Sequence, residues 1–289
     1  MTTQTDEKIA LLKENFFPRM KEADLSDLQD YNYPEPVDWP PFTPREVQVA
    51  LSSVATRKAP GPDGIPNLVL KILKDILWPV LTPLFNACIT FGYCPKHFRM
   101  AETVALRKPG KEDYTQVSSY RPVALLNTLG KVLEKIIARR LSALAEWYSL
   151  LPPTHMGGRK GISTDHALHW IMEKINIELN GKVYRGVVSI LSLDVSGAFD
   201  NVSHARLLHN LRKRRIDLRV VSWIASFLTE RRAMIRLPEA TSEILNVETG
   251  IPQGSPISPI LYLFFNADLI EECHNPSNNT GAVGWIDDV

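Results

Sequence analysis

The chain has 289 residues, of which 44% are hydrophobic and 22% charged, and its 15 glycines and 21 prolines follow no short period. This composition is that of a globular protein and excludes collagen-like, fibrous and disordered classes. No apolar stretch approaches the ~20 residues that a membrane span requires, residues 1–20 do not resemble a signal peptide, and the cysteines include no CxxC pair. We therefore expect an intracellular protein without a membrane partner, a disulfide framework or a zinc site.

The net charge of +1 conceals a segregation of charge along the chain. Residues 1–50 hold 5 basic and 10 acidic side chains, residues 51–236 hold 28 and 14, and residues 237–289 hold 0 and 8. A basic body is typical of a protein that binds a polyanion, and separate carboxylates are the ligands that a divalent metal needs. Solvated helix faces with an acidic tail would give the same pattern, so charge alone leaves both interpretations open.

The first half of the chain alternates helical patterns with proline and glycine. An acidic N-terminal helix is expected before residues 33–44, whose five prolines predict an extended linker. A tight turn at residues 59–64 then precedes a helix over residues 67–77. Apolar side chains at i, i+3, i+4 and i+7 predict two further amphipathic helices, over residues 129–144 and 166–179.

The second half mixes helices with short runs of strand-forming residues. Helical periodicity continues over residues 207–211, 218–228 and 260–270. Strand signals are found at residues 187–193, 233–237, 244–249 and 282–286, and the middle two favour an antiparallel pair. The mixture predicts an α+β fold that is rich in helices and has a small sheet.

Three aspartates follow apolar runs that we interpret as strands. Asp194 comes after residues 187–193, and Asp287 and Asp288 come after residues 282–286. Two such strands side by side would bring the carboxylates together, and a pair of Mg²⁺ ions suits oxygen ligands of this kind. A turn or a helix cap is the plainer role for any single aspartate, and the pattern alone does not decide between the two.

Six blocks of the sequence carry a resemblance to a known family. They are KAPGPDGI (58–65), KPGK (108–111), SYRPVAL (119–125), LDVSGAFDNV (193–202), GIPQGSPISP (250–259) and WIDD (285–288). Their order and spacing over residues 50–289 resemble the reverse transcriptase domain of a non-LTR (LINE-type) retrotransposon. The residues from Ala198 to His204 and from Ile251 to Leu269 resemble the fungal members most.

The resemblance implies the fingers and palm of a right-hand polymerase, with a small antiparallel palm sheet packed with helices. Residues 1–50 would form an acidic N-terminal segment with a proline-rich linker, and residues 51–185 a fingers-like region. Residues 186–289 would form the palm, with a helical insertion at about 204–232. Because the matched motifs end at Asp288, we expect an incomplete palm and no thumb.

The same resemblance implies a two-metal polymerase site. Asp194, Asp287 and Asp288 match the catalytic aspartates, and Asp194, Asp287 and the carbonyl of Val195 would hold two Mg²⁺ ions, for which Mn²⁺ can substitute. The implied reaction is RNA-directed DNA polymerisation. In it a primer 3′-OH attacks the α-phosphate of a dNTP and pyrophosphate leaves. The implied partners are an RNA template, a DNA primer and dNTPs.

Five further residues match positions that contact the nucleotide in the family. Phe199 would occupy the space of a ribonucleotide 2′-OH and so select deoxynucleotides. Gln253 and Gly254 would lie against the incoming nucleotide and the template base. Lys108 and Arg121 would hold the triphosphate, whose oxygens accept strong hydrogen bonds from charged donors.

Two basic segments are candidates for contact with nucleic acid. Arg212, Lys213, Arg214 and Arg215 form a run that would contact template or primer phosphates, although a solvated helix face would look the same. Residues 157–161 (GGRKG) could cradle a phosphate or form an ordinary loop. The resemblance suggests a nuclear location, for which the 212–215 run is only a weak import signal.

Two other functions compete with polymerisation. The chain could be a catalytically inactive, truncated remnant of a transposable element that at most binds nucleic acid through its basic residues. It could also be an unrelated Mg²⁺-dependent phosphotransferase that uses Asp194 and Asp287. Incorporation of dNTPs that depends on a template distinguishes RNA-directed DNA polymerisation from both of these alternatives.

Overall fold

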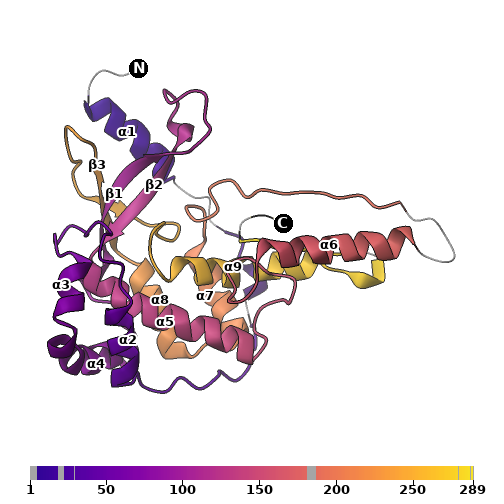
Figure 1. The fold of residues 1–289 in the computed structure, drawn as a ribbon, viewed down its shortest axis with the longest axis horizontal. Helices are drawn as coiled ribbons and strands as arrows, with labels where there is room; N and C mark the ends of the chain where they lie inside the picture. Colours follow the sequence, from indigo (N-terminus) through magenta and orange to yellow (C-terminus); the bar gives the residue numbers. More distant parts are fainter. Residues whose placement is uncertain are drawn as a thin grey trace.

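The protein is α+β, with a four-stranded sheet at one end of a larger helical body (Figure 1). The computed structural model describes residues 5–18, 23–28, 30–180, 187–278, 280–286 and 288. The helices of these residues are, in chain order, α1 (Thr5–Phe16), η1 (Ser26–Leu28), α2 (Pro44–Ser52), α3 (Asn67–Ile72), α4 (Lys74–Thr90), η2 (Lys96–Arg99), η3 (Val117–Ser119), α5 (Thr128–Trp147), α6 (Thr164–Leu179), α7 (His204–Lys213), α8 (Leu218–Leu228), α9 (Ser258–Cys273) and η4 (Pro276–Asn278). The fold class is confirmed, as are the expected helices at residues 129–144, 166–179, 218–228 and 260–270, whereas the helix expected over residues 67–77 is divided at Leu73 into α3 and the start of α4.

The sheet has the strand order β2-β1-β3-β4 and mixes parallel with antiparallel pairs. Its strands are β1 (Met100–Arg107), β2 (Tyr120–Leu126), β3 (Arg231–Arg236) and β4 (Leu245–Val247). β1 pairs with β2 antiparallel and with β3 parallel, and β3 pairs with β4 antiparallel. The β3–β4 pair was expected, whereas the mixed sheet differs from the antiparallel one that the resemblance implied.

Strands β1 and β2 carry no clear strand signal in the sequence. Their residues MAETVALR and YRPVALL are short, contain few β-branched side chains and include a proline. Pairing with neighbouring strands determines the structure here, because β1 lies in the middle of the sheet with a strand on each side. The sheet also joins β1 and β2 to β3 and β4, which lie on the other side of the boundary expected near residue 185. The division of the chain into a fingers-like region and a palm remains a prediction.

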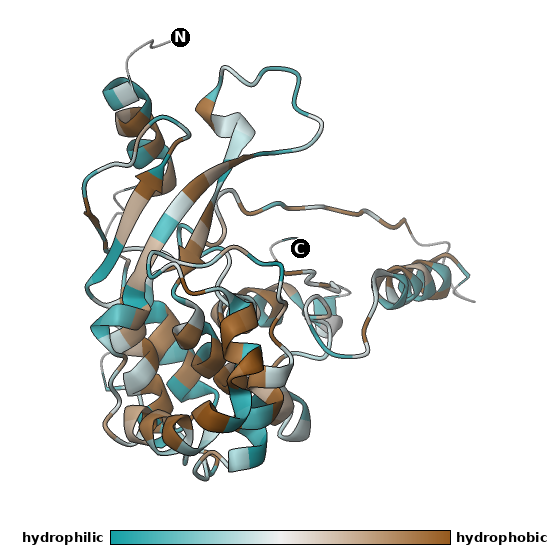
Figure 2. Cartoon of the chain, turned by 60° about the vertical axis from the view of Figure 1, so that its left-hand side comes forward, coloured by the Kyte–Doolittle hydropathy of each residue, from teal (hydrophilic) through white to brown (hydrophobic). Residues whose placement is uncertain are grey.

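One hydrophobic core holds most of the helices together. It runs from the linker before α2 through α4, α5, α7 and α8 to α9, and its largest fully buried side chains include Trp223, Tyr262 and Phe85. Figure 2 shows the apolar residues gathered in this helical body. None of the described helices is long and apolar enough to span a membrane.

Helix α1 covers part of the sheet instead of joining the main core (Figure 1). Its Leu12 and Phe16 pack against Ile235 of β3 in a second, smaller cluster. The acidic N-terminal helix expected from the sequence is therefore present. Its apolar side chains attach it to the sheet.

Residues 187–193 do not form the buried strand expected from their β-branched sequence. They run extended past α6, and Val187, Ile190 and Leu191 are 94%, 70% and 76% exposed (Figure 1). A strand needs a neighbour that completes its backbone hydrogen bonds, and in the described chain this segment finds one only at Asp194. The expected strand at residues 282–286 is likewise reduced to isolated bridges.

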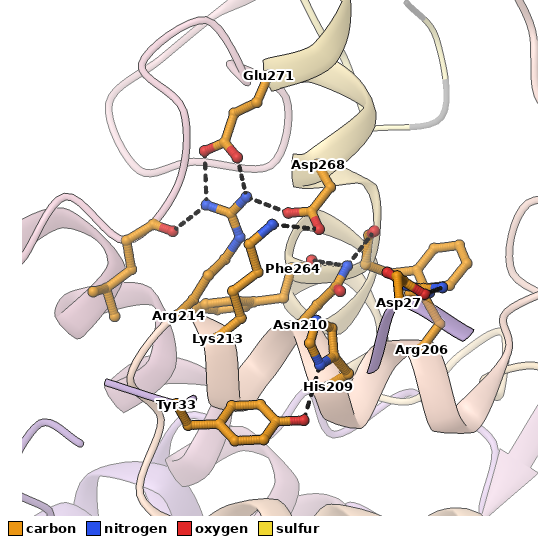
Figure 3. Close-up of polar contacts among 12 residues, drawn as sticks. Asp27, Tyr33, Arg206, His209, Asn210, Lys213, Arg214, Phe264, Asp268 and Glu271 are labelled. Atoms are coloured by element: carbon orange, nitrogen blue, oxygen red, sulfur yellow. Dashed lines mark hydrogen bonds and ion pairs between the residues drawn. The ribbon is translucent and has the colours of Figure 1, made fainter. Parts of the chain in front are cut away.

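A group of charged side chains fastens α7 to α9 (Figure 3). The guanidinium of Arg214, whose side chain is only 9% exposed, donates to both carboxylate oxygens of Glu271, to Asp268 and to the carbonyl of Leu150. Lys213 donates to the other oxygen of Asp268 at 2.9 Å. These contacts satisfy a nearly buried charge and connect the C-terminal half of α9 to the body.

We expect Arg214→Met to lower the free energy of unfolding by about 3 kcal/mol, because it leaves the Glu271 carboxylate and the Leu150 carbonyl without their donor and Asp268 with Lys213 alone. The control is Arg232→Met, which removes an exposed guanidinium that has no ion pair within the described chain and should change stability by less than about 0.5 kcal/mol. Urea unfolding followed by circular dichroism measures both values. Equal losses in the two variants would contradict a stabilising role for the Arg214 contacts.

Candidate active site

Asp194 and Asp288 lie side by side through their backbones. They form an isolated antiparallel bridge, although 93 residues separate them in the chain. Both residues are exposed, and the Asp194 carboxylate makes no hydrogen bond or ion pair within the described residues. The neighbouring Val195 packs against the main core and anchors the segment. Asp287, the remaining residue of the expected triad, lies outside the described residues.

The segment around Asp288 is a tight turn. The amide of Trp285 donates to the carbonyl of Asp288 at 2.8 Å, and the amide of Asp288 donates back to the carbonyl of Trp285 at 3.1 Å. Ile286 within the turn has a φ of 58°, in the left-handed region that a β-branched residue rarely adopts. Such strain persists only where surrounding contacts impose the conformation, and it is concentrated at functional sites.

Residues 154–158 supply those contacts. The amide of Gly284 donates to the carbonyl of Thr154 at 3.0 Å, and the amide of Met156 donates to the carbonyl of Gly284 at 2.8 Å. A Cβ atom on Gly157 would stand 2.4 Å from the amide nitrogen of Ile286, so only glycine permits this approach. The glycine-rich loop that we had considered for phosphate binding therefore packs, at Gly157, against the turn that carries Asp288.

Phe199 lies in a compact loop that follows Asp194. Gly197 takes a φ of 60°, and its carbonyl accepts a hydrogen bond from the amide of Asn201 at 2.9 Å. The Phe199 ring stacks on the ring of Tyr262 from α9, with centroids 5.2 Å apart and planes 12° apart. The aromatic side chain expected to select the sugar is therefore held by the core.

The loop between β4 and α9 lies against two other parts of the site. We call residues 250–257 the 250–257 loop. The amide of Ile251 donates to the carbonyl of Phe199 at 2.8 Å, and a Cβ atom on Gly250 would stand 2.7 Å from the same oxygen. On its other side, the carbonyl of Gln253 accepts from the amide of Ala124 in β2 at 2.7 Å. Segments far apart in sequence thus meet at residues 250–254.

Lys108 and Arg121 belong to the hairpin of β1 and β2. Lys108 follows β1 and donates its backbone amide to the carbonyl of Ser119 at 2.8 Å. Arg121 pairs in register with Leu106, and its side chain is exposed and makes no hydrogen bond or ion pair within the described chain. Burial raises the pKa of Asp200, and the positive charge of Lys108 is among the influences that oppose this rise. The two cations are on the same strand pair that contacts the 250–257 loop.

Three ionisable groups lie beside the 250–257 loop, of which Glu134 and Arg231 are buried and Asp200 is half-buried. Burial raises the pKa of Asp200 to about 6, an effect that its hydrogen bonds from Gln253 oppose. Burial also raises the pKa of Glu134 to about 7 and lowers the pKa of Arg231 to about 10. The Arg231 guanidinium donates to the carbonyl of Gly250 at 2.7 Å.

The sequence analysis did not single out Asp200 or Glu134, and it counted Arg231 only among basic residues. A carboxylate directly after Phe199 in an otherwise apolar motif was the available signal for Asp200. A glutamate within the apolar pattern of residues 129–144 was the signal for Glu134. A small, partly open cavity of about 30 Å³ is lined by Asp200, Arg231 and Gln253 among others, and this volume suits one or two water molecules rather than a nucleotide.

The side chains of the basic run at residues 212–215 contact other parts of the protein. Arg214 and Lys213 bind the acids of α9, as described above. The Arg212 guanidinium lies 3.6 Å from the centroid of the Tyr33 ring, and Arg215 donates to the carbonyl of Glu35 at 3.0 Å. Each side chain thus has a structural contact already, and its contact with nucleic acid remains a prediction.

The donor set fits a divalent cation at Asp194. Asp194 and Asp288 present exposed carboxylates on adjacent backbone positions, and hard cations prefer such oxygen ligands. Among the residues that the structure describes, no three His, Cys, Asp or Glu side chains form a metal site by themselves. Asp287 and the Val195 carbonyl would complete the set that the resemblance implies.

The raised pKa of Glu134 makes stability depend on pH. A folded pKa of about 7 above the ordinary value of 4.5 means that the folded state holds the proton more tightly, so stability falls as pH rises between these values. Glu134→Gln keeps a carbonyl acceptor for Ser255 and removes this loss. We therefore expect the variant to gain about 1 to 3 kcal/mol relative to the parent chain between pH 5 and pH 8. Urea unfolding at both pH values measures it, and a difference that does not change with pH would contradict a buried carboxyl.

Comparisons with a protein family and with three relatives bear on this site. Residues 106–289 match the family described as reverse transcriptase (RNA-dependent DNA polymerase). The chain is 33% identical over 266 residues, or 90% of its length, to the probable RNA-directed DNA polymerase from transposon X-element of Drosophila melanogaster. It is 34% identical over 229 residues, or 79%, to the RNA-directed DNA polymerase from mobile element jockey of Drosophila funebris. It is 28% identical over 247 residues, or 85%, to the retrovirus-related Pol polyprotein from type-1 retrotransposable element R2 of Popillia japonica.

These alignments cover 29%, 24% and 32% of the three relatives, so the chain spans about a quarter to a third of their length. The relatives are insect proteins, so the expected likeness to fungal members is not supported. The helix-packed sheet is consistent with the fingers and palm of a reverse transcriptase, a family that uses divalent metal ions. The chain therefore belongs to the reverse transcriptase (RNA-dependent DNA polymerase) family, as a domain of the non-LTR retrotransposon type.

Proposed function

We propose that this chain carries RNA-directed DNA polymerase activity, the addition of dNTPs to a primer 3′-OH as directed by an RNA template. The observation that carries the proposal is the backbone pairing of Asp194 with Asp288, which brings two acidic motifs together at an exposed position. Membership of the reverse transcriptase family and the names of the X-element and jockey relatives support it. The partners that follow are an RNA template, a DNA primer and dNTPs, and the place of action is the nucleus.

The acidic residues would hold the metal ions of this reaction. We assign Asp194, Asp287 and the Val195 carbonyl to two Mg²⁺ ions, with Asp288 beside them. When bound, the ions neutralise the triphosphate and lower the pKa of the attacking hydroxyl. The exposure of Asp194, together with its lack of a partner among the described residues, supports this role, because its oxygens are available to a ligand.

The other side chains would bind and orient the nucleotide. Lys108 and Arg121, on the β1–β2 hairpin, would hold the triphosphate by charge-assisted hydrogen bonds. Gln253 and Gly254 would lie against the nucleotide and the template base. Phe199 would fill the space of a 2′-OH. Support comes from the packing of β2, the 250–257 loop and the Phe199 loop against one another, which brings these residues to one region.

Asp194→Asn tests the polymerase proposal directly. The amide removes the negative charge with little change in shape, so we expect the rate of dNTP incorporation on an RNA template with a DNA primer to fall more than about 100-fold in Mg²⁺. The control is Asp217→Asn at the N-terminus of α8, which should keep the parent activity. No incorporation by the parent chain, or equal activity in Asp194→Asn, would contradict the proposal.

Phe199→Val tests how the sugar is selected. The smaller side chain opens the space for a 2′-OH, so we expect the preference for dNTPs over rNTPs, measured as a ratio of kcat/KM values, to fall by about 10- to 100-fold. Phe199→Tyr retains the ring and should retain the preference. Because Phe199 also stacks on Tyr262, a melting curve for each variant separates lost selection from lost folding. Unchanged discrimination in a folded Phe199→Val variant would rule out steric selection by this ring.

A further inference from the structure

Two carboxylates, the half-buried Asp200 and the buried Glu134, reach the 250–257 loop from different elements. Asp200 accepts from the side-chain amide of Gln253, with its two oxygens 3.1 Å and 3.0 Å from the Nε2 atom. Glu134 of α5, only 1% exposed, accepts from the hydroxyl of Ser255. Gly254 lies between these two attachment points. The loop is therefore held by a side chain immediately before and immediately after its central glycine.

Gly254 has no freedom to move toward the sheet. Its φ of 111° favours glycine, and a Cβ atom would stand 2.8 Å from the carbonyl oxygen of Ala124 in β2. The Ala124 amide meanwhile donates to the carbonyl of Gln253. Backbone contacts thus fix the loop against β2. They leave the side-chain torsions of Gln253 undetermined, and among the described residues only Asp200 restrains its amide.

The largely buried side chain of Arg231 supplies the opposite charge at this site. It donates to the carbonyls of Thr249 and Gly250 at the start of the loop, and the charges of Asp200 and Glu134 act on it. Buried charges of this kind are weak contributors to stability, because desolvation offsets their attraction. The carboxylates of Asp200 and Glu134 instead provide oriented hydrogen bonds to the 250–257 loop.

We propose that Asp200 and Glu134 are positioning residues for the nucleotide, with Asp200 orienting the Gln253 amide and Glu134 holding Ser255, so that Gln253 and Gly254 present one fixed surface to it. This inference rests on the proposed polymerase function. Loss of this positioning weakens the contact between the 250–257 loop and the nucleotide. It leaves Asp194, Asp287 and Asp288 unchanged. The expected signature is a rise of about tenfold in the KM for dNTP, with a much smaller change in kcat.

A double-mutant cycle tests whether Asp200 acts through Gln253. We expect Asp200→Ala and Gln253→Ala each to raise the KM for dNTP about tenfold, and the double variant to be no worse than either one, because both remove the same restraint. Asp200→Asn keeps an acceptor oxygen and should recover most of the loss. Independent losses that multiply, or an unchanged KM in Asp200→Ala, would overturn the proposal for Asp200.

The proposed role of Glu134 is tested in the same way. The variants are Glu134→Ala, Ser255→Ala and their combination, with Glu134→Gln as the conservative variant. Asp217→Ala, which removes a carboxylate outside this site, is the control and should leave the KM unchanged. Melting curves accompany every variant. A loss of stability that tracks the KM across all variants, the control included, would reduce both residues to a structural role.

A readout that does not require polymerisation separates this inference from the proposed function. In a chain labelled with ¹⁵N at glutamine, the side-chain amide signal of Gln253, assigned by its loss in Gln253→Ala, should shift in Asp200→Ala and return toward its parent position in Asp200→Asn. If the parent chain incorporates no dNTP, the polymerase proposal fails while this signal still reports the orientation of Gln253. An amide signal that is the same in the parent chain and in Asp200→Ala would overturn the positioning role whatever the activity.

Discussion

The close approach of the 250–257 loop to two neighbouring backbones is the constraint on which the rest of the site depends. At Gly250 the loop touches the carbonyl of Phe199, and at Gly254 it touches the carbonyl of Ala124, at distances that any side chain would prevent. These two contacts join the sheet to the segment that follows Asp194. Phe199, the β1–β2 hairpin with Lys108 and Arg121, and the segment after Asp194 are thereby connected through one short stretch of chain.

Polar side chains add hydrogen bonds to the backbone contacts that Gly250 and Gly254 permit. Backbone contacts determine where the 250–257 loop lies, while Asp200, Glu134 and Arg231 determine which way its side chains and carbonyls point. The same division is found between α7 and α9, where apolar packing brings the helices together and Arg214 aligns them through Asp268 and Glu271 (Figure 3). In both places the hydrogen bonds of a charged side chain fix the orientation of the neighbouring elements.

The turn that carries Asp288 combines strain with support. Ile286 holds an unfavourable φ, and the loop at residues 154–158 closes over the turn through backbone hydrogen bonds and the bare Cα of Gly157. Asp194 lies opposite, at the end of an exposed segment whose β-branched side chains have no strand beside them in the described chain. The two acidic motifs therefore meet through a single bridge. Most of their rigidity comes from the elements behind them.

The sequence by itself determined several of the helices and the family. Stripes such as that of α5 follow from local periodicity, and the ordered motifs around Asp194, Gln253 and Asp288 identify the family without any coordinates. Tertiary structure decided the other half of the sheet, because β1 becomes a strand only between β2 and β3, and residues 187–193 remain without strand pairing for lack of a neighbour in the described chain. It also decided the roles of Asp200, Glu134 and the 212–215 run. Burial and hydrogen-bond partners depend on residues distant in the chain, which local sequence patterns do not encode.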